Sequence, residues 1–148
     1  SLLETCRRLM RGGAVRFHMA CHVEILMQLI CLILEPVVLV ADDLVLTIDE
    51  VAPGTQVVAL TSVAEALSAM QHLHTVDLAF VNLPPDGFAE SELGRALADA
   101  QAVAVFLGYE VEARAMGLRY LEQPILAESV AGELARRQAD GRKSVPGP

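Results

Sequence analysis

The sequence predicts a three-layer α/β fold in which five parallel strands form a doubly wound sheet. The main observation is a fivefold alternation, from residue 29 onward, of a short apolar run and a segment with helical periodicity. The runs that would be inner strands are continuously apolar, which is typical of parallel strands buried on both faces. The length of 148 residues and a hydrophobic fraction of 53% suit one domain with its own core.

The expected strands and helices follow one another in strict order. Strands are expected over 29–34, 56–60, 76–81, 102–107 and 118–122. A helix with Pro36 in its first turn follows the first strand and ends before Pro53. Thr61 or Ser62 can cap the second helix, with Glu65 in capping-box position. Further helices are expected over 88–100, 110–116 and 125–138.

The segment VVLVADD (37–43) offers a different register for the first strand, which would then end in Asp42 and Asp43. Only residues 44–56 would then separate those acids from the next strand, and a helical crossover with two loops needs more chain. A strand over 29–34 leaves room for a four-turn helix. We therefore place Asp42 and Asp43 on the solvated face of the first helix.

The chain divides into three parts by composition. Residues 1–24 hold four arginines, with Leu2, Leu3, Cys6, Leu9 and Met10 at helical spacing, and are expected to form an N-terminal helical extension. Residues 25–138 carry the strand and helix alternation. The glycine- and proline-containing end, residues 139–148, is expected to be a flexible tail.

Charge and composition exclude several classes of function. A net charge of -8 and a pI near 4.9 argue against nucleic acid as a partner. The longest apolar stretch, residues 25–41, is interrupted by Gln28, Glu35 and Pro36, so no membrane span is expected. Three cysteines, Cys6, Cys21 and Cys31, form no paired pattern, and Cys31 reads as a buried thiol. These features fit a cytoplasmic protein without disulfides.

Five strings of the sequence resemble the receiver domain of bacterial two-component response regulators. They are, in order, LILEPVVLVADDL, TSVAEALSAM, DLAFVNLPPDG, VFLGYE and YLEQP. The resemblance covers about residues 29–138 and lies in the order and spacing of the strings. It implies the flavodoxin-like, CheY-like strand order 2-1-3-4-5 and a role in phosphorelay signalling.

The resemblance also implies where the phosphorylation site would lie. Its phosphoacceptor aspartate falls on Asn82, or on Phe80 if the gap is moved by two residues. The pair of metal-binding acids falls on Ile33 and Leu34, which leaves only Glu35. The hydroxyl position falls on Gly108 or is deleted, and the lysine position falls on Gln123.

These four departures predict a degenerate receiver that carries no catalytic residue. An amide cannot form an acyl phosphate, and without the acids Mg²⁺ has few of the oxygen ligands it prefers. We expect no cofactor, lost or weak Mg²⁺ binding, and action through contact with proteins such as a histidine kinase or another regulator. An unusual phosphorylatable receiver that uses Asp42 or Asp43 is the alternative.

Tyr120 and the first helix are the expected contact features. The resemblance places Tyr120 at the family's switching aromatic, although a half-buried strand tyrosine is an equal interpretation. Leu39, Val45 and Leu46 are more apolar than one core stripe requires, which favours a homodimer.

Two further site hypotheses are weaker. His18 and His22, with Cys21 beside them, are spaced like zinc ligands but lack an evident fourth ligand, so we expect no metal site. No glycine-rich nucleotide loop or nucleophile motif is present, so an enzyme is not expected. If the chain were a small α/β enzyme, His74, Asp86 and Glu110 would be expected to line the carboxyl edge of the sheet.

Overall fold

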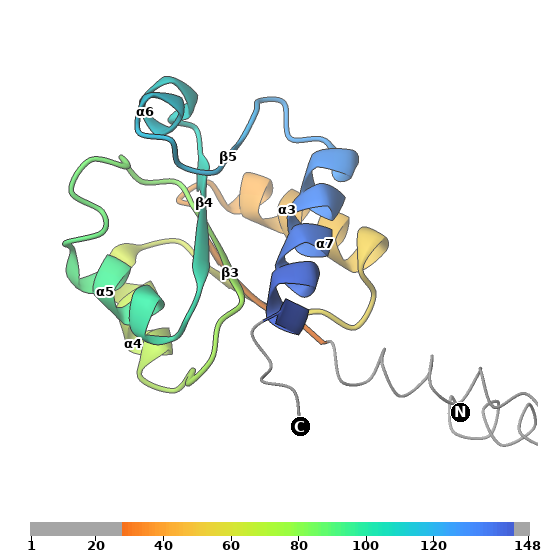
Figure 1. Cartoon of the computed structure of the whole chain (residues 1–148), viewed down its shortest axis with the longest axis horizontal. Coiled ribbons are helices and arrows are strands. Elements are labelled where there is room, and N and C mark those ends of the chain that lie inside the picture. The colour runs from red at the N-terminus through yellow and green to blue at the C-terminus, as the bar shows by residue number, and fades with distance from the viewer. Residues whose placement is uncertain (1–27, 144–148) are drawn as a thin grey trace, which may run out of the picture.

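The computed structural model describes residues 28–143, and they form one five-stranded parallel sheet flanked by helices (Figure 1). The sheet order is β2-β1-β3-β4-β5, and every neighbouring pair is parallel. The strands are β1 (Ile30–Leu34), β2 (Gln56–Leu60), β3 (Leu78–Val81), β4 (Val103–Leu107) and β5 (Tyr120–Leu121). The predicted fold class and strand order are thus confirmed, and each strand boundary lies within two residues of its expected position.

Helices cover both faces of the sheet. They are α3 (Val38–Val51), α4 (Val63–Met70), α5 (Glu92–Asp99), α6 (Glu110–Ala115) and α7 (Ala127–Lys143). Helices α3 and α7 pack side by side on one face, while α4, α5 and α6 cover the other (Figure 1). The predicted extension over residues 1–24 lies outside the described residues.

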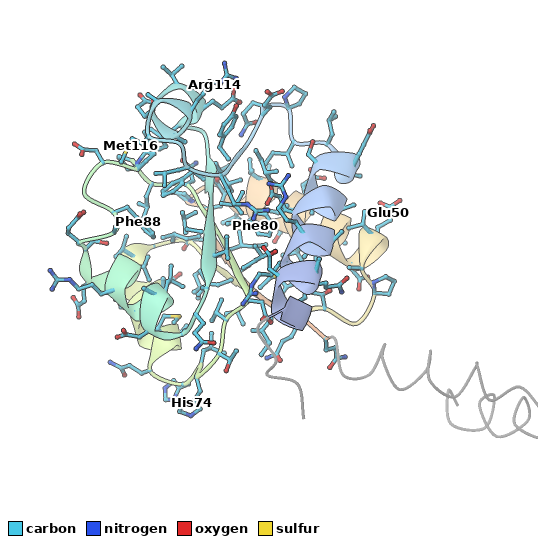
Figure 2. All side chains as sticks on the ribbon, viewed as in Figure 1. Glu50, His74, Phe80, Phe88, Arg114 and Met116 are labelled. Atoms are coloured by element: carbon cyan, nitrogen blue, oxygen red, sulfur yellow. The ribbon has the colours of Figure 1, made fainter. Side chains whose placement is uncertain are left out.

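The core consists of two apolar layers because successive strand residues point to opposite faces. In β1, Ile33 joins the layer beneath α3 and α7, and Leu34 joins the layer beneath α4 and α5. Phe80 of β3, shown at the centre of Figure 2, is fully buried in the first layer. Cys31 is a buried free thiol, as expected. Burial, and then the nearby Asp77 carboxylate, raise the pKa of Cys31 to about 12, so the thiol stays protonated at neutral pH.

Arg137 of α7 ties that helix to the amino edge of the sheet. Its Nε donates to the carbonyl oxygen of Asp77 at 2.9 Å, and one terminal nitrogen donates to the carbonyl oxygen of Gln101 at 3.2 Å. The Asp77 carboxylate in turn accepts from the backbone N–H of Ile30 at 2.8 Å. One guanidinium therefore links α7 to the segments that lead into β1, β3 and β4.

The helix starts differ from the prediction in two places. Helix α3 begins at Val38 with Val37 as its N-cap, so Pro36 precedes the first turn instead of lying within it. Helix α5 begins at Glu92, because the Ser91 hydroxyl caps it by accepting from the N–H of Gly94 at 3.0 Å. Residues 88–91, predicted as helix, form a turn.

Helices α4 and α7 test the predicted capping box and the predicted tail. Ser62 caps α4 by accepting from the N–H of Glu65, and the Glu65 carboxylate reaches back to Thr61. The predicted cap by Ser62 is therefore confirmed, and the Glu65 carboxylate binds Thr61, the residue before the N-cap. Helix α7 runs to Lys143, five residues beyond its expected end, so residues 139–143 belong to a helix and not to a flexible tail.

Candidate functional site at the carboxyl edge of the sheet

Two polar side chains meet where β1 and β3 end. Glu35 is the first residue after β1, and Asn82 is the first residue after β3. The Asn82 side-chain amide nitrogen, Nδ2, donates to Oε2 of Glu35 at 2.8 Å. Their backbones are also fixed, because Asn82 N–H donates to the Leu34 carbonyl at 2.8 Å and Glu35 N–H donates to that of Leu60 at 3.0 Å. The carboxyl ends of the three strands β2, β1 and β3 thus hold this pair in place.

Glu35 is buried, and its two carboxylate oxygens have different partners. Only 3% of the residue is exposed, and it is the one buried charged residue in the described part of the chain. Oε2 accepts from Asn82, while Oε1 accepts from the backbone N–H of Val37 at 3.0 Å. Within residues 28–143, no cation contacts this carboxylate. Its charge is stabilised by an amide and by the N–H that opens helix α3.

Gly108 closes the site from the end of β4. Its φ of +83° is in the left-handed region, where glycine is favoured. A β-carbon built at this position would lie 3.0 Å from Oδ1 of Asn82, so the amide sits directly against the glycine. The structure therefore brings together three predicted site residues, Glu35, Asn82 and Gly108.

Gln123 lies at the end of β5 and belongs to a separate contact. Its side chain is exposed, and its backbone N–H donates to a carboxylate oxygen of Glu110 at 2.5 Å. The peptide bond between Gln123 and Pro124 is cis. The exposed amide of Gln123 shares this edge of the sheet with Asn82 but makes no hydrogen bond with it.

Three other predicted positions do not contribute side chains to the site. Ile33 and Leu34 lie within β1 and point into the two apolar layers. Glu35 is therefore the only acidic side chain that β1 places at the carboxyl edge of the sheet. Phe80 is buried in the middle of β3, and Asn82 is the residue that follows the strand. Where the resemblance places the family's acidic pair, this chain has two core residues, and the one carboxylate after β1 is Glu35.

Asp42 and Asp43 lie on α3 and not at the end of a strand. Both are exposed, while Ala41, Leu44 and Ile48 form the buried stripe of the helix. This confirms the preferred register for β1. It also places both aspartates outside the site that Glu35 and Asn82 form.

Tyr120 of β5 is half-buried and is held by a residue of α6. The Nε of Arg114 donates to the Tyr120 hydroxyl at 2.9 Å, and the guanidinium carbon lies 5.5 Å from the ring centroid. This hydrogen bond raises the pKa of Arg114, and the Glu122 and Glu110 carboxylates raise it further. Arg114 also lies 3.7 Å from a Glu122 carboxylate oxygen. The tyrosine therefore has a defined position between α6 and the end of the sheet.

The hypothetical enzyme residues do not share one edge. Asp86 follows β3 and Glu110 follows β4, so both are on the carboxyl side of the sheet. His74 lies in the loop that leads from α4 into β3, which is on the amino side, opposite Arg114 in Figure 2. The expectation that His74 lines the carboxyl edge was wrong, because a loop from a helix into a parallel strand lies at the strand's amino end.

Residues 28–143 contain no group of three or more His, Cys, Asp or Glu side chains placed to hold a metal ion. His18, Cys21 and His22 lie outside the described residues. None of the described helices is long and apolar enough to cross a membrane.

Solved structures share this arrangement. The two component transcriptional regulator AraC from Clostridium phytofermentans matches with a TM-score of 0.60 and 18% identity, over 80% of this chain and 100% of that one. A CheY-like response regulator receiver domain from Methylobacillus flagellatus matches with a TM-score of 0.55 and 22% identity, over 74% and 98%. The chain has the receiver fold. A pilus assembly-related protein from Burkholderia pseudomallei shares it too, with a TM-score of 0.59 and 14% identity, over 76% and 90%.

The receiver fold is supported here by structure and not by sequence similarity. No family model matches the chain, and no curated protein matches its sequence. The receiver fold brings the ends of β1, β3 and β4 to one edge, where Glu35, Asn82 and Gly108 lie. The direct bond between Glu35 and Asn82 was not predicted. The sequence feature that could have indicated this bond is that Glu35 and Asn82 are each the first polar residue after a central strand.

Proposed function

We propose that this chain is a receiver-fold signalling domain that is not phosphorylated, is not an enzyme, and acts through protein contacts. The observation that carries the proposal is the pairing at the carboxyl edge. The residue after β3 is an amide, and the carboxylate after β1 already accepts two hydrogen bonds. An amide is not a nucleophile that forms an acyl phosphate, and both oxygens of the neighbouring Glu35 carboxylate already accept hydrogen bonds within the protein.

Phosphorylation chemistry gives the direct test. We expect no mass increase when the full chain is incubated with acetyl phosphate and Mg²⁺, and no saturable spectral shift with beryllofluoride. A receiver domain with all its acidic residues serves as the positive control. Stoichiometric phosphate uptake, or a beryllofluoride response with sub-millimolar affinity, would contradict the proposal.

The variant Asn82→Asp tests whether the missing nucleophile alone prevents phosphorylation, or whether the other missing receiver residues also prevent it. It restores a carboxylate after β3 but leaves Gly108 and Gln123 unchanged. We expect it to remain unphosphorylated, because Glu35 is then the only other acid at the site. Uptake of phosphate by this variant would mean that Asn82 alone silences the site, and that the other departures matter little.

Helix α3 provides the surface for the proposed protein contacts. Leu39 is 80% exposed and Leu46 is 68% exposed, and Val37 and Val38 lie open beside the start of the helix. Val45, predicted as part of this surface, instead packs partly against the core. Exposed apolar residues gathered on one helix are typical of a contact surface. We infer that two copies of the chain associate through α3, with a histidine kinase or another regulator as a further protein partner.

Self-association through α3 predicts a specific response to charge. Leu39→Glu combined with Leu46→Glu is expected to weaken dimerisation at least tenfold, while Val111→Glu on α6, which is 79% exposed, is the matched control. Because Asp42 and Asp43 flank the surface, higher salt should strengthen association by screening their repulsion. Sedimentation velocity over a range of concentrations measures both effects. A chain that stays monomeric at every concentration, or equal dimerisation of the double variant, would overturn this inference.

A further inference from the structure

A concave cavity lies on the α5 side of β4, and Asn82 is not among its lining residues. Its volume is about 490 Å³. Its walls come from four segments: residues 85–90 between β3 and α5, helix α5, residues 102–106 at β4, and residues 116–119 before β5. Figure 2 shows Phe88 and Met116 on the side of the sheet that α5 and α6 cover.

The cavity exists because short helices and small residues leave β4 partly uncovered. Helix α5 has 8 residues and α6 has 6. Between them β4 presents Ala104, and Ala102 lies just before the strand, so little side-chain volume rises from the sheet. Both alanines are only half-buried, whereas Phe106 further along the strand is 2% exposed. The hollow is therefore built into the fold by the sequence of β4 and the late start of α5.

The lining is apolar and includes aromatic rings. Phe88 and Phe106 meet edge to face, with ring centroids 5.3 Å apart and planes at 84°. Both rings are themselves buried, with Phe88 9% and Phe106 2% exposed, so the open apolar contacts come from Met116 and Leu118, which are 51% and 36% exposed. A flexible thioether suits apolar ligands of varied shape.

The charges at the rim restrict the ligand further. Asp86 and Glu90 line the mouth of the cavity on one side. The one cation among the lining residues is Arg119, whose guanidinium is already paired with the Glu133 carboxylate of α7. An anionic ligand would therefore meet two acids and no free cation, whereas a neutral or cationic ligand would not be repelled.

We propose that this cavity binds a small apolar molecule that is neutral or positively charged. The volume falls within the range of about 300–1,000 Å³ typical of small-molecule sites, which are also mostly apolar and concave. Four separate segments surround one floor, and this favours a compact ligand over an extended protein surface. Such a site would allow a small metabolite to regulate a receiver fold without phosphoryl chemistry.

Fluorescence titration of the full chain with N-phenyl-1-naphthylamine, a neutral two-ring probe, gives the test. We expect saturable binding at one site per chain. The variant Ala104→Leu fills the floor of the cavity and is expected to weaken binding at least tenfold. Ala98→Leu narrows the cavity from the exposed side of α5, where folding is little affected, and should weaken binding about threefold or more. Ala59→Leu, on the exposed edge strand β2, is the matched control and should leave binding unchanged.

A comparison of two probes tests whether the cavity excludes anionic ligands. 1-Anilinonaphthalene-8-sulfonate has the same ring system with an added sulfonate, and we expect it to bind at least tenfold more weakly. Combining Asp86→Asn with Glu90→Gln should reduce the difference in affinity between the two probes. The proposal is overturned if the neutral probe shows no saturable binding, or if Ala104→Leu and Ala98→Leu both bind it as the parent does. Equal binding of the two probes would also overturn the proposed ligand class.

Discussion

Replacing Gly94 with alanine is expected to lower the free energy of unfolding by about 3 kcal/mol, a large loss for a single methyl group. Gly94 is buried in the first turn of α5. A β-carbon built there would lie 1.9 Å from the carbonyl oxygen of Phe88 and 2.9 Å from its carbonyl carbon. Both obstacles are backbone atoms, so no side chain can rotate away to relieve the clash.

Displacing the Phe88 carbonyl would also disturb other hydrogen bonds, because this carbonyl has further partners. It accepts from the backbone N–H of Ser91 at 3.0 Å and from the Ser91 hydroxyl at 2.6 Å. The same hydroxyl caps α5 by accepting from the N–H of Gly94. Moving the carbonyl therefore disturbs the helix cap, whose loss costs about 1 kcal/mol by itself, and the packing of Phe88 on Phe106.

Gly132→Ala is the matched control for this experiment. Gly132 lies in α7, is exposed, and has no atom within 4 Å of a built β-carbon. Alanine favours the helix more than glycine does, so this variant should gain about 0.5–1 kcal/mol. Urea denaturation of both variants measures the two changes. A loss below about 0.5 kcal/mol for Gly94→Ala would show that the turn over residues 88–91 yields easily.

In the turn over residues 88–91, the spacing of apolar residues in the sequence did not indicate where helix α5 begins. Residues 88–100 read as one helix because Phe88, Leu93 and Leu97 are spaced by four and five residues. The chain instead forms a turn before Ser91, because the serine hydroxyl caps the next segment and Gly94 allows the turn to pack closely. Ser91 was the available signal for a helix start. By contrast, the strands were predictable within two residues, since continuous apolar runs between polar segments leave few alternative registers.

The site was predictable in its residues but not in its contacts. Asn82, Glu35 and Gly108 each follow a strand, and the parallel topology brings strand ends to one edge. The resemblance places the family's acidic pair at Ile33 and Leu34, but a resemblance between sequences does not decide which residue is the last to point into a core layer. The side-chain alternation of β1 decides it: Ile33 and Leu34 fill opposite faces, and Glu35 is the first residue free to turn toward Asn82.

Replacing Asn82 with leucine is expected to destabilise the fold by about 2–3 kcal/mol. Leucine is close to asparagine in size but cannot donate a hydrogen bond. Glu35, which is 3% exposed, would keep a single partner, the N–H of Val37. The loss therefore comes mainly from a buried carboxylate left without its amide, and only in small part from the missing bond itself.

The double variant Glu35→Leu with Asn82→Leu distinguishes this cause from simple disruption of packing. Removing both polar groups leaves no charge to solvate, so stability should recover by more than half of the single-variant loss. Urea denaturation of the parent, both single variants and the double variant completes a cycle whose coupling energy we expect to exceed about 1 kcal/mol. Additive losses would mean that Glu35 and Asn82 act independently. A coupling energy above that value would show that the buried carboxylate and the amide stabilise the fold as a pair.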